Sequence, residues 1–88
     1  MTILELRKKV AELGYPPQFY SIFGGVVEGT VLEKMENLGS YRVSNVERGK
    51  RYDERFFATE EAAADYMYEY LSRVARVFYQ KNGKGEAV

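Results

Sequence analysis

Cysteine, histidine and tryptophan are all absent from the sequence. A chain without cysteine forms no disulfide, binds no metal through thiolates and has no thiol nucleophile. A chain without histidine lacks the commonest general base and the commonest transition-metal ligand. No run of apolar residues is longer than three, so the sequence predicts neither a membrane-spanning segment nor the core of a signal peptide. We therefore expect a cytoplasmic protein that does not associate with membranes.

Net charge is also missing, because 13 lysines and arginines balance 13 aspartates and glutamates. A neutral chain is a poor candidate for a protein that coats nucleic acid or anionic lipid through positive charge. The length of 88 residues and the hydrophobic fraction of 45% are typical of one folded domain. We expect this domain to cover residues 1–81 and the glycine-containing stretch 82–88 to be a flexible tail.

The first segment carries the signals of an amphipathic helix. Thr2 and Glu5 have the spacing of a capping box, in which each side chain accepts a hydrogen bond from the backbone N–H of the other residue. Gly14 is a typical C-terminal cap, and Pro16 and Pro17 prevent the helix from continuing. The apolar positions recur at helical spacing and are Ile3, Leu6, Val10 and Leu13.

Four segments in the middle of the chain are rich in β-branched and aromatic residues. Residues 18–23 are expected to be a short strand or an extended arm. Residues 30–36, 41–46 and 52–57 are expected to be strands, since turns that contain glycine separate them. Short strands joined in this way predict an antiparallel meander of three or four strands.

The last predicted helix begins after Thr59, a typical N-cap, and ends near Gln80. Its apolar residues again recur at helical spacing, so both helices have one face to bury. We therefore predict a single α+β domain in the order helix, antiparallel meander, helix, with both helices on one face of the sheet. The predicted core comprises Leu6, Val10, Leu13, Val43, Phe57, Met67, Tyr70, Leu71, Val74 and Phe78.

Three carboxylates around the last hairpin are the candidates for catalysis or metal binding. Glu47, Asp53 and Glu54 could approach one another across this hairpin, and paired carboxylates perform acid–base chemistry or hold Mg²⁺. We favour cross-strand ion pairing instead, because cations are interleaved with them. The sequence therefore predicts no enzyme, no metal and no other cofactor. The interleaved cations are Arg42, Lys50, Arg51 and Arg55.

The same hairpin offers an alternative function in nucleic-acid binding. Aromatic side chains beside arginines stack on bases in many RNA-binding modules, and the predicted order of elements is also that of a double-stranded-RNA-binding domain. In that family a lysine cluster begins the second helix, whereas this chain has acidic residues there, which repel phosphates. The candidate RNA-contacting residues are Arg48, Lys50, Arg51 and Arg55, with Tyr41, Tyr52 and Phe56 nearby.

The outer face of the last helix is the candidate protein-binding surface. The helix has four carboxylates before its first cation, Arg73, although the whole chain is neutral. A helical wheel places Tyr68 and Tyr79 away from the main apolar stripe, and exposed tyrosines beside charges are common in protein interfaces. An ordinary solvated helix face is the competing interpretation. The predicted partner-binding residues are Glu60, Glu61, Asp65, Tyr68, Glu69 and Tyr79.

Several segments together resemble a known class of proteins. These are residues 13–25 (LGYPPQFYSIFGG), the turn Glu47-Arg48-Gly49 and the helix start Thr59–Ala64 (TEEAAA). In this order they resemble the small immunity proteins of bacterial polymorphic-toxin systems, the class that includes contact-dependent growth inhibition. The resemblance implies a cytoplasmic, non-catalytic protein that binds and neutralises the toxic domain of a cognate effector, of which a nuclease is one example.

Two other classes of function stay open at this point. One is the RNA-binding module that uses the basic hairpin. The other is a small structural protein that self-associates through the uncovered face of its sheet. The oligomeric state and the activity of a toxin partner are not specified by the sequence.

Overall fold

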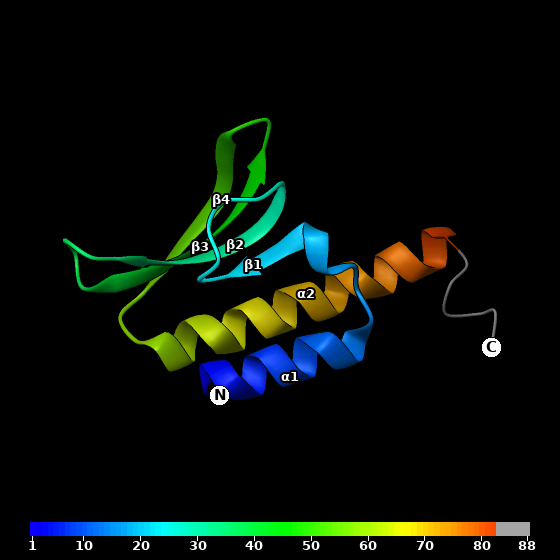
Figure 1. Cartoon of the computed structure of the whole chain (residues 1–88), viewed down its shortest axis with the longest axis horizontal. Helices are drawn as coiled ribbons and strands as arrows, with labels where there is room; N and C mark the ends of the chain where they lie inside the picture. The colour runs from blue at the N-terminus through cyan, green and yellow to red at the C-terminus, as the bar shows by residue number, and fades with distance from the viewer. Residues whose placement is uncertain (83–88) are drawn as a thin grey trace.

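Two helices lie side by side on one face of a four-stranded sheet in the computed structural model, which describes residues 1–82 (Figure 1). The predicted α+β domain with both helices on the same face is thus confirmed. The predicted tail from residue 83 onward lies outside the described residues, and Asn82, expected to begin it, is instead the last residue of the second helix. The elements are α1 (Ile3–Leu13), the 3₁₀ helix η1 (Pro17–Phe19), β1 (Tyr20–Ile22), β2 (Gly29–Met35), β3 (Ser40–Glu47), β4 (Lys50–Phe57) and α2 (Glu60–Asn82).

The caps of α1 are those that the sequence predicts. The Glu5 N–H donates to the Thr2 hydroxyl at 3.1 Å, and the Thr2 N–H donates to the Glu5 carboxylate at 2.8 Å. Gly14 follows the last turn with a φ of 73°, in the left-handed region that favours glycine. Local sequence alone therefore determines where this helix begins and ends.

α1 and α2 run in the same direction, and a polar contact joins them near each end of α1. Near the first end the Met1 amino group lies 2.5 Å from an Asp65 carboxylate oxygen. Near the second end the Tyr79 hydroxyl donates to the Leu13 carbonyl at 2.7 Å. These two contacts show which flank of α2 is covered by α1.

β1 departs from the predicted antiparallel meander. The strand order is β1-β2-β3-β4, and β2, β3 and β4 are antiparallel neighbours as expected, but β1 pairs with β2 in parallel. Of the predicted segment 18–23, only residues 20–22 form a strand, and the 3₁₀ helix η1 ends directly before it. The parallel pairing is possible because residues 23–28 bring the chain back to the start of β2. Gly29 is required for this return, since a Cβ atom there would lie 2.0 Å from the Phe19 carbonyl oxygen.

The β3–β4 hairpin bends away from the second half of α2 (Figure 1). Arg48 and Gly49 form its turn, with φ values of 53° and 79°. The pairing is irregular between Val43 and Asn45 of β3, and within this bulge Asp53 of β4 has a φ of 54°. Bulges bend a strand and increase its twist. The tip of the hairpin therefore projects from the domain, and the last turns of α2 extend without a covering strand (Figure 1).

The core lies between the sheet, α1 and the first half of α2. Five predicted core residues are buried: Leu6, Val10, Val43, Met67 and Leu71. The other five are only half-buried: Leu13, Phe57 and Tyr70 pack against the core from its margin, and the prediction is wrong for Val74 and Phe78. These five lie toward helix ends, on the edge strand or on a flank of α2, where less of the protein covers them. The core also contains Ile22, Leu32, Ala63 and Ala64.

Candidate functional site

α2 begins with an exposed acidic turn. The Thr59 hydroxyl accepts a hydrogen bond from the Ala62 N–H at 3.1 Å, so Thr59 is the predicted N-cap. Glu60 and Glu61 follow in the first turn, where the partial positive charge of the helix N-terminus stabilises carboxylates. Both are exposed, and within residues 1–82 neither forms an ion pair. Together with Asp65 and Glu69 they form what we call the acidic start of α2.

A shallow groove of about 640 Å³ runs along the outer face of α2 next to this turn, and we call it the outer groove. Asp65 and Glu69 lie toward its first end, with side chains that are 62% and 74% exposed. Arg73 and Arg76 lie toward the other end, so the charge of the groove changes sign along the helix. The lining residues are Met1, Asp65, Tyr66, Tyr68, Glu69, Ser72, Arg73 and Arg76.

Half of these lining residues belong to α2 but escaped the sequence prediction. They are Tyr66, Ser72, Arg73 and Arg76. The signal that identifies two of them, Ser72 and Arg76, is a polar stripe, since positions 65, 69, 72 and 76 follow one another at helical spacing. The helical wheel places Ser72 and Arg76 on the same face as Asp65, but the predicted partner-binding residues were restricted to carboxylates and tyrosines.

The two tyrosines predicted for this face lie on the flank of α2 that α1 covers. Tyr79 is half-buried and its hydroxyl donates to the Leu13 carbonyl of α1, so this hydroxyl is already engaged within the chain. Tyr68 is also half-buried, packs against the core, and has the Lys9 ammonium 5.5 Å from its ring centroid. It is available only where its ring lines the outer groove. A helical wheel cannot reveal this, because it does not show where α1 packs.

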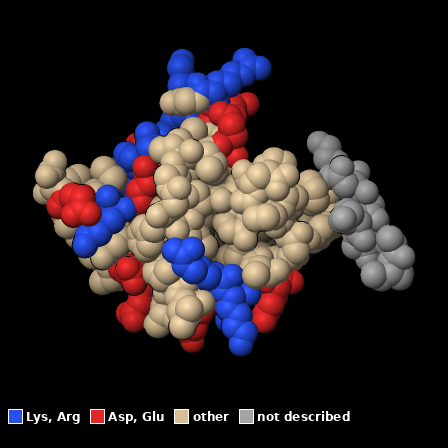
Figure 2. Space-filling model, in the orientation of Figure 1, with Lys and Arg blue, Asp and Glu red and all other residues tan. Residues whose placement is uncertain are grey.

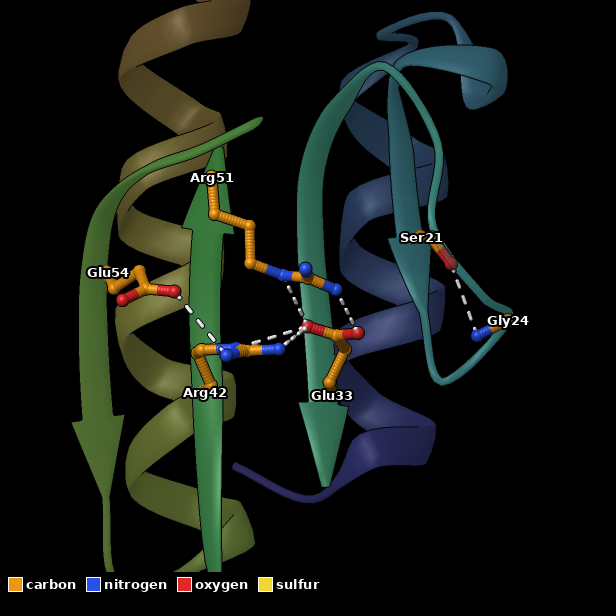
Figure 3. A network of polar contacts seen from close by, with 6 residues as sticks. All are labelled: Ser21, Gly24, Glu33, Arg42, Arg51 and Glu54. Atoms are coloured by element: carbon orange, nitrogen blue, oxygen red, sulfur yellow. Dashed lines mark hydrogen bonds and ion pairs between the residues drawn. The ribbon is translucent and has the colours of Figure 1, made fainter. Parts of the chain in front are cut away.

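The face of the sheet away from the helices carries a layer of ion pairs (Figure 3). The Glu33 carboxylate accepts hydrogen bonds from Arg42 at 2.9 and 3.2 Å and from Arg51 at 2.8 and 3.2 Å. Arg42 also lies 3.4 Å from the Glu54 carboxylate. The side chains of Glu33 and Arg42 are only 22% and 16% exposed, so the layer is partly shielded from water.

The pKa of Glu33 reflects two opposing effects. Partial burial raises this pKa, whereas the hydrogen bonds and positive charges of Arg51 and Arg42 lower it. The arginines outweigh burial, so the pKa of Glu33 lies below its usual value. Glu33 was not singled out in the sequence. The signal that could have identified it is strand register, because Glu33 stands directly opposite Arg42 once β2 and β3 are paired.

The basic hairpin is therefore only partly available for binding. Arg51, one of its predicted RNA-contacting residues, is engaged by Glu33 on the open face of the sheet. Arg48, Lys50 and Arg55 are exposed, and Figure 2 shows lysines and arginines gathered at the hairpin tip. The four cations thus do not form one free basic surface.

The three candidate catalytic carboxylates do not form a shared site either. Glu54 pairs with Arg42, as the ion-pairing interpretation predicts. Glu47 and Asp53 form none of the predicted ion pairs within the described part of the chain. Among residues 1–82 no three acidic, histidine or cysteine side chains gather in a way that could hold a metal ion.

No family model, curated protein or solved structure matches this chain. Neither helix, as far as residue 82, combines the length and the apolar content that crossing a bilayer requires. The function is therefore inferred from the chain's own surfaces. The acidic start of α2 and the adjoining outer groove are the surfaces that join concentrated charge to a concave shape.

Proposed function

We propose that this chain is a non-catalytic immunity protein of a bacterial toxin system, and that its acidic start of α2 binds and neutralises the toxic domain of a cognate effector. The observation that carries the proposal is the concentration of four carboxylates in residues 60–69 of a chain whose net charge is zero. All four are exposed; Asp65 contacts the Met1 amino group and Glu69 lies 4.0 Å from Arg73, whereas Glu60 and Glu61 form no ion pair within residues 1–82. Such a field attracts and orients a cationic partner.

Charge complementarity supports a nuclease as the toxic domain. A nuclease holds a polyanion in a cationic cleft, and an acidic protein surface can occupy that cleft and exclude the phosphate backbone. Glu60 and Glu61 are suited to this role because they are exposed and unpaired within residues 1–82. Because no cation of the described residues neutralises these two carboxylates, they are available to pair with cations of a partner.

The outer groove supports a contact of defined shape beside this charge. Tyr66 and Tyr68 both line the groove, and tyrosine is enriched among the interface residues that contribute most to affinity. Ser72 contributes a small side chain to the same lining. A loop of the toxic domain that enters the groove would meet carboxylates at one end and aromatic rings at its sides.

The two other hypotheses have less support. RNA binding has less support because Arg51, one of its predicted contacts, is already paired with Glu33. The acidic start of α2 would also repel phosphates. Self-association through the uncovered sheet face is disfavoured because that face carries the Glu33 ion-pair layer (Figure 3) rather than an apolar surface. We therefore retain protein binding as the proposed function.

A growth-protection assay tests the proposal, and its toxic domain is to be sought in an effector gene next to the gene of this chain. Cells that express the toxic domain should grow with the parent chain and should stop growing with the Glu60→Lys/Glu61→Lys variant. The matched control is Glu12→Lys/Glu47→Lys, which makes the same change in net charge at two exposed carboxylates outside the site. The control should protect like the parent. Equal protection by both variants would remove the acidic start from the interface, and failure of the parent to protect would refute the immunity function.

A further inference from the structure

A second groove, distinct from the outer groove, lies along the last turns of α2. It has a volume of about 350 Å³ and is lined by Tyr15, Arg73, Val74, Val77 and Phe78; we call it the apolar groove. Val77 is 58% exposed and Val74 is half-buried, because the sheet does not extend over this part of the helix (Figure 1). Two neighbouring valines thus face solvent instead of the core.

Aromatic contacts hold one side of the apolar groove in place. The ring centroids of Tyr15 and Phe78 are 5.5 Å apart, in an edge-to-face arrangement, and those of Tyr15 and Phe19 are 5.8 Å apart. The Phe19 and Phe78 centroids lie at 6.5 Å and close the cluster. Figure 2 shows that the surface around η1 and the adjoining part of α2 consists mainly of uncharged residues. The groove is therefore formed before any partner binds.

The spacing of the valines matches recognition of an amphipathic segment. Val77 and Phe78 lie three and four residues after Val74, so all three lie on one face of the helix. Amphipathic helices bind to such apolar faces through side chains at the same intervals. Removing the exposed valine surface from water is favourable, which makes this face a suitable place for apolar contacts.

The charge around the apolar groove indicates which partner it accepts. Arg73 lines the groove with a side chain that is 56% exposed, and the Glu69 carboxylate one turn earlier lies 4.0 Å from it, an exposed contact that solvent weakens. Between Tyr70 and Gln80 the charged residues are Arg73 and Arg76, both cations. A second copy of this chain, docked through a two-fold axis, would place these cations opposite one another, which is unfavourable. A partner segment that carries carboxylates beside its apolar side chains has the complementary charge.

We infer that the apolar groove binds an acidic amphipathic segment of a protein partner, with its aliphatic side chains on Val74 and Val77 and a carboxylate paired with Arg73. Arg73 lines both grooves, but Val74 and Val77 line only the apolar groove, and Glu60 and Glu61 line neither. The inference therefore does not rest on the proposed function, and either one can fail without the other.

Nuclear magnetic resonance titration of the full ¹⁵N-labelled chain tests the inference. The probe is a synthetic amphipathic peptide with leucines at intervals of three and four and glutamates between them; a second peptide has lysine in place of each glutamate. The glutamate peptide should shift the amide signals of Tyr15, Val74 and Val77 and reach saturation. The lysine peptide should bind about tenfold more weakly, which corresponds to 1.4 kcal/mol.

Two variants and a control distinguish binding at the apolar groove from nonspecific hydrophobic binding. Val77→Asp should abolish the shifts, and Arg73→Glu should reverse the preference between the two peptides. The control Leu4→Asp makes the same kind of change at an exposed aliphatic residue on α1 and should bind like the parent. Equal binding of both peptides, shifts located elsewhere, or no binding would overturn the inference. Shifts at the groove that grow with protein concentration in the absence of peptide would instead assign it to a second copy of the chain.

Discussion

The two halves of α2 have the same apolar spacing but different surroundings. In the first half Ala63, Ala64, Met67 and Leu71 are completely buried against the sheet and α1. Among the described side chains of the second half only Ala75 is buried, because the hairpin bends away and leaves the valines uncovered. Apolar periodicity therefore predicts which face of a helix is apolar, whereas the lengths and bends of its neighbours determine how deeply that face is buried.

Matched truncations in the two halves should show the largest difference. Leu71→Ala should lower the free energy of unfolding by about 2–5 kcal/mol, because it leaves a cavity in the core. Val74→Ala should cost less than about 1.5 kcal/mol, since this side chain is already half in water. Urea denaturation followed by circular dichroism measures both values. Equal losses would mean that the second half of α2 is as well covered as the first.

The first half of α2 packs on a sheet whose opposite face carries the Glu33 ion pairs, so removing these pairs should destabilise the same part of the domain. Glu33→Gln should lower the free energy of unfolding at pH 7 by about 1–2 kcal/mol, because two partly buried guanidinium groups lose their anionic partner. The control Glu47→Gln changes an exposed carboxylate without an ion pair in the described residues and should have almost no effect.

Lowering the pH should weaken the same ion pairs, because protonation removes the charge of Glu33. Because the folded-state pKa of Glu33 lies below its usual value of 4.5, its contribution to stability is present above pH 4.5 and is lost as the pH falls through the folded pKa. The parent should therefore lose stability in this range, and the Glu33→Gln variant should lack that part of the loss. Urea midpoints between pH 3 and pH 7 measure it, and identical pH profiles would contradict this role of Glu33.

A smaller effect is expected where the second half of α2 is attached to α1. Tyr79→Phe removes the hydrogen bond to the Leu13 carbonyl and should cost about 0.5–1.5 kcal/mol. Hydrogen exchange should become faster in the last turn of α1. Tyr52→Phe is the control, because the Tyr52 side chain is 47% exposed. If both variants were as stable as the parent, the second half of α2 would be held by apolar contacts alone.

Much of the fold could be predicted because its signals are local. The capping box at Thr2, the cap at Gly14 and the N-cap at Thr59 each depend on residues a few positions apart. The parallel pairing of β1 could not be predicted, since it depends on how residues 23–28 return the chain and on the absence of a side chain at Gly29. Such a return leaves no periodic pattern in the sequence.

The candidate site was predictable only in its charge. The acidic residues at positions 60, 61, 65 and 69 are exposed on α2 as expected. The availability of Tyr68 and Tyr79 was not predictable, because it depends on the flank against which α1 packs. The Glu33 layer was hidden for a similar reason, since its members come from three strands whose register is a property of the folded sheet.

Association kinetics with the toxic domain test the central claim most directly. We predict that Glu60→Lys/Glu61→Lys slows association at least about tenfold at low salt, and that the difference from the parent shrinks as the ionic strength rises. The charge-matched Glu12→Lys/Glu47→Lys variant should associate nearly as fast as the parent. Equal association rates for the two double variants at every salt concentration would contradict the claim that the acidic start of α2 captures the partner.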